Sequence, residues 1–220
     1  DTICSVAYQE FNQNVKNKPL IRNTFITNSS KSSARQFLDF LEQEHRRGKH
    51  YNIVAYNGAR FDYYFLISQL TETELLHTEI SLRGYSVIGM NYLDHTFRDP
   101  NCFLIGSLSK LCKSFKVDTP KLTEFELDGK ILTNENLCFY KPELTFNEFM
   151  ELQQKEPDFW KLYVEYCEFD CISLRELWTS FTSTTKELIT KMNPKILRAC
   201  NVNGSKTVGS LAKKMIDNLQ

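Results

Sequence analysis

The stretch 157–192 constrains the fold most, because it predicts one long helix. Pro157 suits the first turn of a helix, where its missing N–H would have no partner in any case. Apolar side chains then recur at helical spacing: Trp160, Tyr163, Val164, Cys167, Cys171, Leu174 and Leu177. A capping box formed by Thr145 and Glu148 predicts a helix start shortly before this stretch.

Shorter elements lie on either side of the long helix. Apolar, β-prone runs predict strands, and apolar residues three and four apart predict helices. The strands are expected at 3–8, 52–56, 85–90 and 102–105, and the helices from 34 to about 45, from 61 to 70, at 108–115 and at 211–219. Residues 117–144 have the composition of a loop. In a chain of 220 residues, these elements predict one α/β domain, or one domain with a short appendage.

Composition excludes several classes of protein. The chain has 27 Lys and Arg against 27 Asp and Glu, so a binder that relies on bulk positive charge is excluded. The charge is unevenly spread, because 118–180 is acidic and 181–220 is basic. Seven cysteines without Cys-x-x-Cys or Cys-x-His spacing make both a structural zinc site and a disulfide framework improbable. They predict a reducing, intracellular compartment such as cytoplasm, nucleus or virion. No apolar run reaches the roughly 18 residues of a membrane span, so no membrane partner is expected.

The first group of residues suited to chemistry is Asn57-Gly-Ala-Arg-Phe61-Asp62, directly after the predicted strand at 52–56. A strand followed by a turn and a helix start is a common place for a functional site in α/β folds. The carboxylate of Asp62 could hold a divalent cation, and the amide of Asn57 could reach a nucleotide. Asn57-Gly58 between two apolar runs is also a strong hairpin signal, so a plain turn remains open as an alternative.

The second group is Tyr166-Cys-Glu-Phe-Asp170, inside the long predicted helix. Tyr166 and Asp170 are four residues apart, so both side chains project from one face. A tyrosine hydroxyl beside a carboxylate could position a water molecule for attack. The alternative is that the pair is an ordinary neighbouring core residue and surface acid.

Taken together, Asn57-x-x-x-Phe61-Asp62 and Tyr166-x-x-x-Asp170 resemble the second and third motifs of proofreading exonucleases in family B DNA polymerases. These exonucleases belong to the DEDD group with tyrosine in the last motif. The segments 97–115 and 161–178 are similar to those of protein-primed polymerases of phages, linear plasmids and virus-like transposons. The resemblance covers most of residues 1–180. It implies an RNase H-like α/β fold with a mixed central sheet and flanking helices.

The resemblance also implies roles for the motif residues. Asp62 and Asp170 would be catalytic acids that bind Mg²⁺ or Mn²⁺ in a two-metal site, a general strategy of nucleases. Tyr166 would orient the attacking water. Asn57 would bind the frayed primer end, and Phe61 would pack against its terminal base or sugar, where stacking contributes about 1–3 kcal/mol.

A further set of expected DNA-binding residues lies between the motifs. Lys110 and Lys113 could contact the single strand, or they could form an ordinary solvated helix face. Pro100 stands where protein-primed enzymes usually have a serine that touches single-stranded DNA or the priming protein. A Ser-Leu pair follows a few residues later, and we therefore include Ser107 and Leu108 as candidate DNA contacts.

The first motif of the family, Asp-x-Glu on the opening strand, is not visible in this sequence. Glu124-Phe-Glu126 and the stretch 39–42 have the wrong context to replace it, and residues 1–11 resemble the strand that follows it. We therefore expect residues 1–190 to form an exonuclease-like domain without this motif, with an incomplete metal site. Residues 191–220 are expected to form a linker and the start of a polymerase domain, since 207–216 resembles the lead-in to the palm.

The function expected from this resemblance is 3′–5′ proofreading within a protein-primed family B DNA polymerase. The expected partners are single-stranded DNA at the primer 3′ end, the remainder of the polymerase and a terminal priming protein. Two alternatives stay open. One is a catalytically inactive exonuclease fold that binds nucleic acid or protein, and the other is a free-standing DEDD exonuclease.

Overall fold

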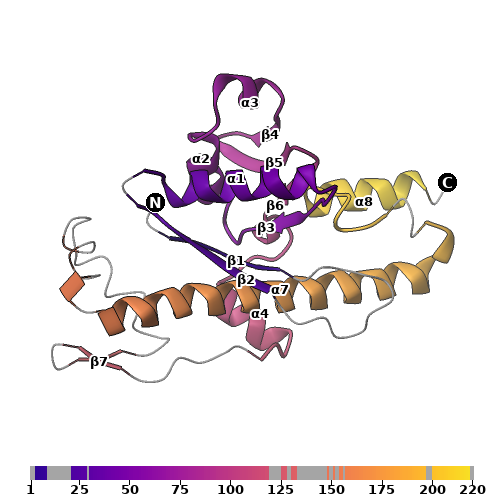
Figure 1. Cartoon of the computed structure of the whole chain (residues 1–220). Helices are drawn as coiled ribbons and strands as arrows, with labels where there is room; N and C mark the ends of the chain where they lie inside the picture. The colour runs from indigo at the N-terminus through magenta and orange to yellow at the C-terminus, as the bar shows by residue number, and fades with distance from the viewer. Residues whose placement is uncertain are drawn as a thin grey trace.

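The computed structural model describes residues 3–8, 21–28, 30–118, 125–127, 130–132, 148, 151, 154–155, 157–196 and 200–218. The described residues form both helices and strands, in groups of one to three along the chain (Figure 1). In chain order they are β1 (Ile3–Tyr8), β2 (Ile21–Ile26), α1 (Ser33–Arg46), β3 (Asn52–Val54), α2 (Asp62–Ile67), α3 (Glu72–Leu76), β4 (Glu79–Arg83), β5 (Ser86–Tyr92), β6 (His95–Arg98), η1 (Pro100–Cys102), α4 (Leu108–Ser114), β7 (Phe125–Leu127), β8 (Lys130–Leu132), α7 (Pro157–Met192), η3 (Pro194–Ile196) and α8 (Val208–Asp217).

The largest sheet has four strands in the order β3-β6-β5-β4. β3 and β6 are parallel, with Ile53 opposite Phe97, whereas β6, β5 and β4 are successively antiparallel. β1 and β2 form a separate antiparallel pair, as do β7 and β8. Because β3 and β6 run in the same direction, the turns that follow their last residues lie at one edge of the sheet.

Helices cover both faces of this sheet. Ile53 packs toward a core shared by α1, α2, β5 and β6, whereas Val54 packs toward a core shared by α7 and α8. This alternation follows from the period of two in a strand. The first core consists of Ala34, Phe37, Leu38, Leu41, Tyr63, Leu66, Val87, Met90, Tyr92 and Phe97. The mixed sheet with flanking helices is the RNase H-like α/β arrangement that the sequence predicts.

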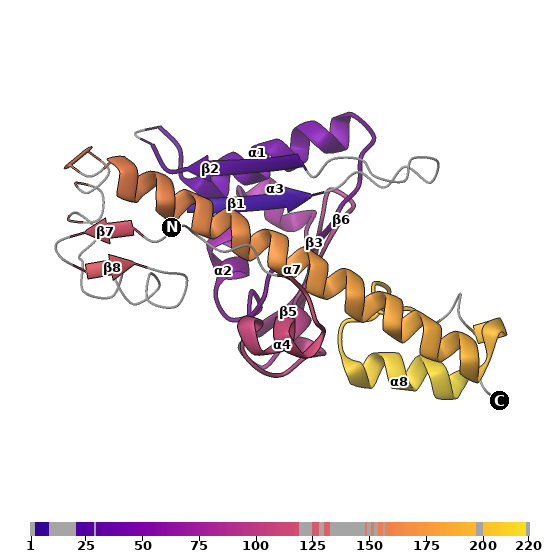
Figure 2. The same ribbon diagram turned by 90° about the horizontal axis from the view of Figure 1, so that it is seen from below.

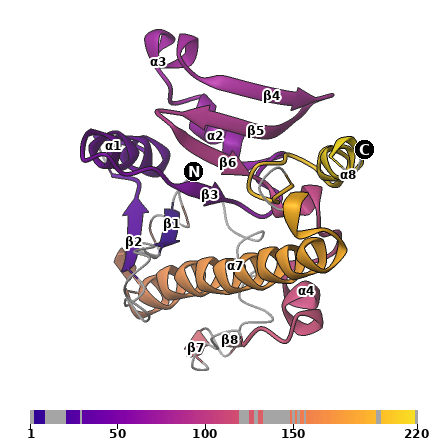
Figure 3. The same cartoon turned by 90° about the vertical axis from the view of Figure 1, so that its right-hand side faces the viewer.

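Helix α7 has 36 residues and crosses the whole molecule, which corresponds to a length of about 54 Å. Strands β1 and β2 lie along it, as Figure 2 shows. The four-stranded sheet and α1 are on one side of α7, and α4 packs on the other side (Figure 3). Helix α7 therefore lies between α4 on one side and the four-stranded sheet with α1 on the other.

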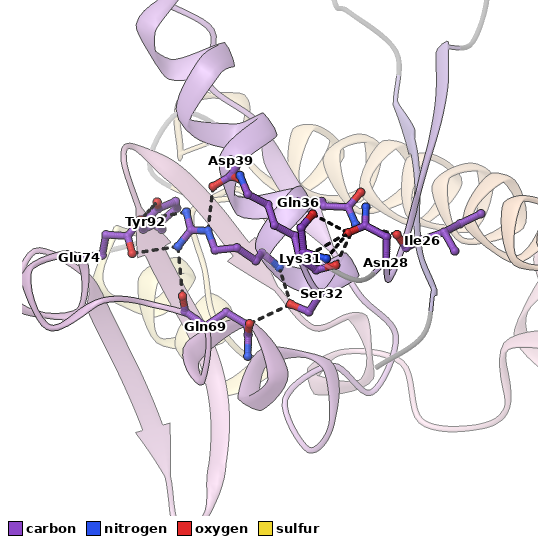
Figure 4. A network of polar contacts seen from close by, with 11 residues as sticks. Ile26, Asn28, Lys31, Ser32, Gln36, Asp39, Gln69, Glu74 and Tyr92 are labelled. Carbon is purple, nitrogen blue, oxygen red and sulfur yellow. Dashed lines mark hydrogen bonds and ion pairs between the residues drawn. The ribbon is translucent and has the colours of Figure 1, made fainter. Parts of the chain in front are cut away.

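A polar network joins α1 to the segment around α3 (Figure 4). The Arg35 guanidinium donates to Glu74 at 3.0 and 3.1 Å and to Asp39 at 2.8 Å, and Tyr92 Oη donates to Glu74 at 2.9 Å. Burial opposes ionisation of Glu74, but the hydrogen bonds from Arg35 and its neighbours outweigh it and lower the pKa of Glu74 to about 2. This network fixes the end of α2 and the start of α3 against α1.

Most of the predicted elements are confirmed. The long helix spans 157–192 as expected, α1 and α4 occupy the expected ranges, and α8 begins at Val208, three residues earlier than predicted. The predicted strand at 102–105 is wrong, because Asp99 and Pro100 start the short helix η1 there. Strands β7 and β8 lie in the segment expected to be loop. Thr145 of the predicted capping box lies outside the described residues.

Among the described residues, no helix combines the length and the apolar character that crossing a membrane requires.

Candidate functional site

The turn after β3 is held by a buried carboxylate from the end of β6. Asp99 is 2% exposed and accepts three backbone N–H groups. The N–H of Asn57 donates to Oδ1 at 2.9 Å, that of Ala59 to Oδ2 at 3.1 Å, and that of Asn101 to Oδ1 at 2.8 Å. Because charge-assisted bonds to a carboxylate are strong, they fix the turn relative to the sheet.

This turn has a backbone that few sequences adopt. Asn57 has φ 61°, a left-handed conformation that asparagine tolerates better than most residues. A Cβ on the buried Gly58 would lie 2.7 Å from the Cβ of Ala55, so only glycine fits there. The Gly58 carbonyl then accepts from the N–H of Tyr63, which leads the chain into α2. The hairpin alternative for Asn57-Gly58 is therefore wrong, since the turn leads into a helix.

Phe61 and Asp62 stand at the start of α2, after this clamped turn. Phe61 is 58% exposed, which is unusual for a phenylalanine so close to the core. Asp62 is the first residue of α2, and most of the residue is exposed. Its carboxyl group is nevertheless partly desolvated by the surrounding protein atoms, which raises its pKa. The nearby charge of Asp99 raises this pKa further. A divalent cation would relieve this repulsion between carboxylates.

The side chain of Asn57 is oriented by Asn101, a residue that follows Pro100. The Nδ2 group of Asn101 donates to Oδ1 of Asn57 at 3.3 Å. The NH₂ group of Asn57 then has no acceptor among the described residues and stays available as a donor to a ligand. Asn101, the residue after Pro100, thus supports the side chain of Asn57.

Tyr166 and Asp170 lie on α7, as predicted, with Tyr166 half-buried and Asp170 exposed. Helix α4 docks one turn further along, where the Cys112 thiol donates to the carbonyl of Ser173 at 3.9 Å. Burial raises the pKa of Cys112, and the charge of Asp170 adds to the rise, which places Asp170 beside α4. Asp170 therefore lies on the side of α7 that faces α4, the helix that carries the predicted lysines.

A tyrosine connects the two parts of the site. Tyr56, just before the clamped turn, donates its hydroxyl to the carbonyls of Leu104 and Gly106. Ser107 follows and is the N-cap of α4, where its hydroxyl accepts from the N–H of Lys110 at 3.4 Å. Tyr56 thus joins the turn to the start of α4, and Cys112 joins α4 to the middle of α7.

The remaining candidates lie on α4. Leu108 is its first residue and is half-buried, whereas Lys110 and Lys113 are exposed. The two lysines are three residues apart on a helix, so they share a face. Exposed lysines on one face of α4 suit the approach of a polyanion to this helix.

Aromatic packing fixes the turn against the second half of α7. Phe103, four residues after Asp99, has its ring centroid 5.7 Å from that of Trp178 and 6.0 Å from that of Phe181. Val54 joins the same cluster. Asn57, Phe61 and Asp62 thus come from one turn, and Ser107, Lys110, Lys113 and Asp170 from the α4–α7 contact. These two groups are joined through Tyr56 and through this aromatic cluster.

The comparison with protein families agrees with this arrangement. The family model of type B DNA polymerases, organellar and viral, matches residues 43–219, which include all of the candidate residues. The chain belongs to this family of DNA polymerases. A search of the curated proteins and a search of the solved structures gave no match. Membership of this polymerase family implies that the chain is part of an enzyme that binds DNA and uses divalent metal ions.

The donor atoms present fit the metal ions of such a polymerase. Mg²⁺ and Mn²⁺ prefer carboxylate oxygens, and both Asp62 and Asp170 are exposed carboxylates. Asp99 is 2% exposed, and its carboxylate accepts the three backbone N–H groups that hold the turn. We therefore assign Asp99 as a positioning residue.

Asp99, Asn101 and Tyr56 belong to the site but were not among the residues predicted from the sequence. A local signal for Asp99 was present, because Asp followed by Pro and Asn is a typical start of a short helix. Its contacts to Asn57 and Ala59 join residues 42 and 40 positions apart, and no local pattern reveals them.

Proposed function

We propose that this chain is the proofreading 3′–5′ exonuclease domain of a protein-primed type B DNA polymerase. The observation that carries the proposal is the Asp99 clamp. It holds one turn that presents an amide donor, an exposed aromatic ring and a carboxylate with a raised pKa, on Asn57, Phe61 and Asp62. These three groups suit the end of a nucleic-acid strand.

Each residue has a distinct role in this proposal. The NH₂ group of Asn57 donates to the terminal nucleotide, and the ring of Phe61 stacks on its base or sugar. The hydroxyl of Tyr166 orients the water that attacks the last phosphodiester. Bound at Asp62 and Asp170, Mg²⁺ or Mn²⁺ would supply an activated water and stabilise the leaving 3′ oxygen.

Helix α4 is the proposed path of the single strand. Lys110 and Lys113 are exposed and contact phosphates, and the start of the helix at Ser107 and Leu108 contacts the strand or a terminal priming protein. The rest of the polymerase is the second proposed partner. A reducing, intracellular location stays part of the proposal.

Two further carboxylates are needed for a complete two-metal site, and the 220 residues contain no Asp-x-Glu. Within the described residues, β1 pairs only with β2, and β3 pairs only with β6, so each has an edge that could accept another strand. We propose that a strand from outside the 220 residues, carrying the Asp-x-Glu acids, pairs with the free edge of one of these strands. The isolated chain is therefore expected to bind DNA and to cleave it poorly.

The test is degradation of a single-stranded oligonucleotide, labelled at its 5′ end, by the intact polymerase that carries this domain, in Mg²⁺. We expect stepwise shortening from the 3′ end. Asp62→Ala and Asp170→Ala should each reduce the rate by roughly 100-fold or more, the size expected for damage to a metal site. Asp158→Ala, an exposed acid in the first turn of the same helix, is the matched control and should leave the rate unchanged.

Two results would overturn the proposal. One is shortening of the oligonucleotide that persists in both Asp62→Ala and Asp170→Ala. The other is an intact polymerase that binds the oligonucleotide but does not shorten it, which would favour the inactive binding module.

A further inference from the structure

Three of the four histidines of the chain lie together at the edge of the sheet opposite the Asp99 clamp. His45 is in the last turn of α1, His50 is just before β3, and Asp94 is in the turn between β5 and β6. One ligand atom of each of these three residues lies within 4.8 Å of the others. We propose that His45, His50 and Asp94 bind a divalent transition-metal ion, with Zn²⁺ as the preferred ion.

The nitrogen of His45 that faces Asp94 lacks any other partner. Nδ1 of His45 is buried and makes no hydrogen bond among the described residues. It lies 3.9 Å from Oδ2 of Asp94, which is too long for a hydrogen bond. Two ligands of a tetrahedral zinc ion are about 3.4 Å apart, so a small rotation of the exposed Asp94 side chain would bring both atoms to bonding distance. A bound ion would satisfy the orphaned nitrogen.

His95, the third clustered histidine, supports the site without being a ligand. Its Nδ1 accepts the N–H of Tyr51 at 3.1 Å, and its Nε2 then donates to the carbonyl of Leu41 at 2.9 Å. Both nitrogens are therefore engaged. Its ring lies within 6.3 Å of the rings of His45 and His50 and limits how they can turn. The protein thus offers three ligands, which leaves a fourth position for water.

The backbone around the ligands is held in place before any ion binds. Gly48, with φ 72°, turns the chain back at the end of α1, and its N–H donates to the carbonyl of His45 at 2.8 Å. Leu93 and Asp94 both have positive φ and form the tight turn between β5 and β6. Ligands on fixed turns lose little conformational freedom on binding, which favours a metal site.

The local electrostatics permit a cation. Glu44 accepts from Arg47 at 2.6 Å and lies 3.0 Å from Nζ of Lys49, so both of these cations are paired with a buried carboxylate. The carboxyl end of α1, where His45 lies, carries the negative end of the helix dipole. Both effects lower the repulsion that a divalent ion would meet in this basic segment.

The ligand set distinguishes this site from the proposed nuclease site. Two imidazoles and one carboxylate suit Zn²⁺, whereas Mg²⁺ prefers oxygen ligands in octahedral geometry. His50 and Asp94 come just before the first residues of the parallel strands β3 and β6, so they lie at the end of the sheet opposite to Asn57 and Asp62. The ion would join the α1–β3 connection to the β5–β6 turn.

The test is calorimetric titration of the chain with ZnCl₂ in excess Mg²⁺. We expect one Zn²⁺ to bind with an affinity that His50→Ala and Asp94→Asn each weaken by roughly 10- to 100-fold. Asn tolerates the positive φ of Asp94, so this variant preserves the turn. His77→Ala is the matched control, because His77 is the remaining histidine, is exposed and lies outside the cluster. It should leave zinc affinity unchanged.

Thermal unfolding gives a second measurement. At a Zn²⁺ concentration about 100 times the Kd, Tm should rise by roughly 5–10 °C, and the rise should disappear in the double variant of His50 and Asp94. Zinc could instead bind to cysteines of the chain. A spectrum with Co²⁺ distinguishes these two binding sites, since only thiolate ligands add a charge-transfer absorption. Zinc affinity that is unchanged in both variants, or a thiolate spectrum with Co²⁺, would overturn the proposal.

Discussion

The two ends of the parallel pair β3–β6 are built in the same way but leave different groups exposed. At the carboxyl end, the buried Asp99 accepts three backbone N–H groups. At the amino end, His95 is 0% exposed and is bonded to the backbone through both ring nitrogens. At each end, one buried side chain, Asp99 or His95, fixes the local backbone through hydrogen bonds. The residues next to it are then left to contact a ligand.

The difference between the ends lies in those neighbours. Asp99 is surrounded by an amide, an aromatic ring and a carboxylate, which suit a nucleotide and a hard cation. His95 is surrounded by two imidazoles and a carboxylate, which suit a softer transition metal. In this chain, a buried side chain with all of its hydrogen bonds made marks the position of each candidate site. The residues next to it indicate which kind of ligand the site would bind.

The largest effect on stability is expected from Asp99→Ala. This change leaves three N–H groups near the buried turn without their acceptor, and it should lower the free energy of unfolding by about 2–5 kcal/mol. Urea unfolding followed by circular dichroism measures it. Asp94→Asn, at the opposite end, is the control and should change this free energy by less than about 0.5 kcal/mol. A loss below about 1 kcal/mol for Asp99→Ala would show that the clamp does not hold the turn.

A smaller loss is expected from His95→Phe. The phenyl ring keeps most of the volume but removes the acceptor of the Tyr51 N–H and the donor to the Leu41 carbonyl. The expected loss is about 1–3 kcal/mol, because two hydrogen bonds are lost and not three. The same urea measurement applies, with the exposed His77→Phe as control. If His95→Phe destabilised the chain more than Asp99→Ala, the ranking of the two ends would be wrong.

The two ends should also respond to pH in opposite directions. Burial raises the pKa of Asp99 above 3.8, so protonation of this side chain favours the folded chain at low pH, and that proton-linked gain is lost as pH rises through the folded-state pKa. Burial lowers the pKa of His95 below 6.5, so its contribution is present above 6.5 and is lost as pH falls. Each slope is at most about 1.4 kcal/mol per pH unit.

Urea unfolding at a series of pH values checks this prediction. Asp99→Asn should flatten the acidic part of the profile relative to the unchanged chain, and His95→Phe should flatten the part just below pH 6.5. Profiles of both variants that run parallel to that of the unchanged chain would contradict it.

The smallest effect on stability is expected from Phe61→Ala. Because the ring is 58% exposed, the free energy of unfolding should change by less than about 0.5 kcal/mol. Binding of a 3′ single-stranded oligonucleotide should nevertheless weaken by about 1–3 kcal/mol, as measured by fluorescence anisotropy without divalent cations. Phe65→Ala, at 51% exposure one turn later, is the control. Equal losses of binding in both variants would remove the specific role of Phe61.

Local patterns in the sequence predicted the longer helices and the strands β1, β3 and β5. They did not predict β4, β6 and α3, nor the contacts between elements. The apolar spacing at 157–192 was long enough to define α7, and the position of Asp62 at the start of α2 followed from its place after a strand and a turn. The strand predicted at 102–105 was wrong because short apolar runs do not distinguish strands from packed turns, as Phe103 shows. His45 and His50 carried no recognisable signal, since Asp94 comes from a turn 44 residues after His50.

The Asp99 clamp also has a consequence for the order in which the chain acquires its site during synthesis. Asn57 leaves the ribosome 42 residues before the carboxylate that fixes its backbone. Until Asp99 has emerged and β6 has paired with β3, the glycine-containing turn has none of the tertiary bonds to that carboxylate. Parallel pairing of strands far apart in the chain is among the slower steps of folding. The nascent chain should therefore complete α1 and α2 first and acquire the ordered turn only when the second parallel strand arrives.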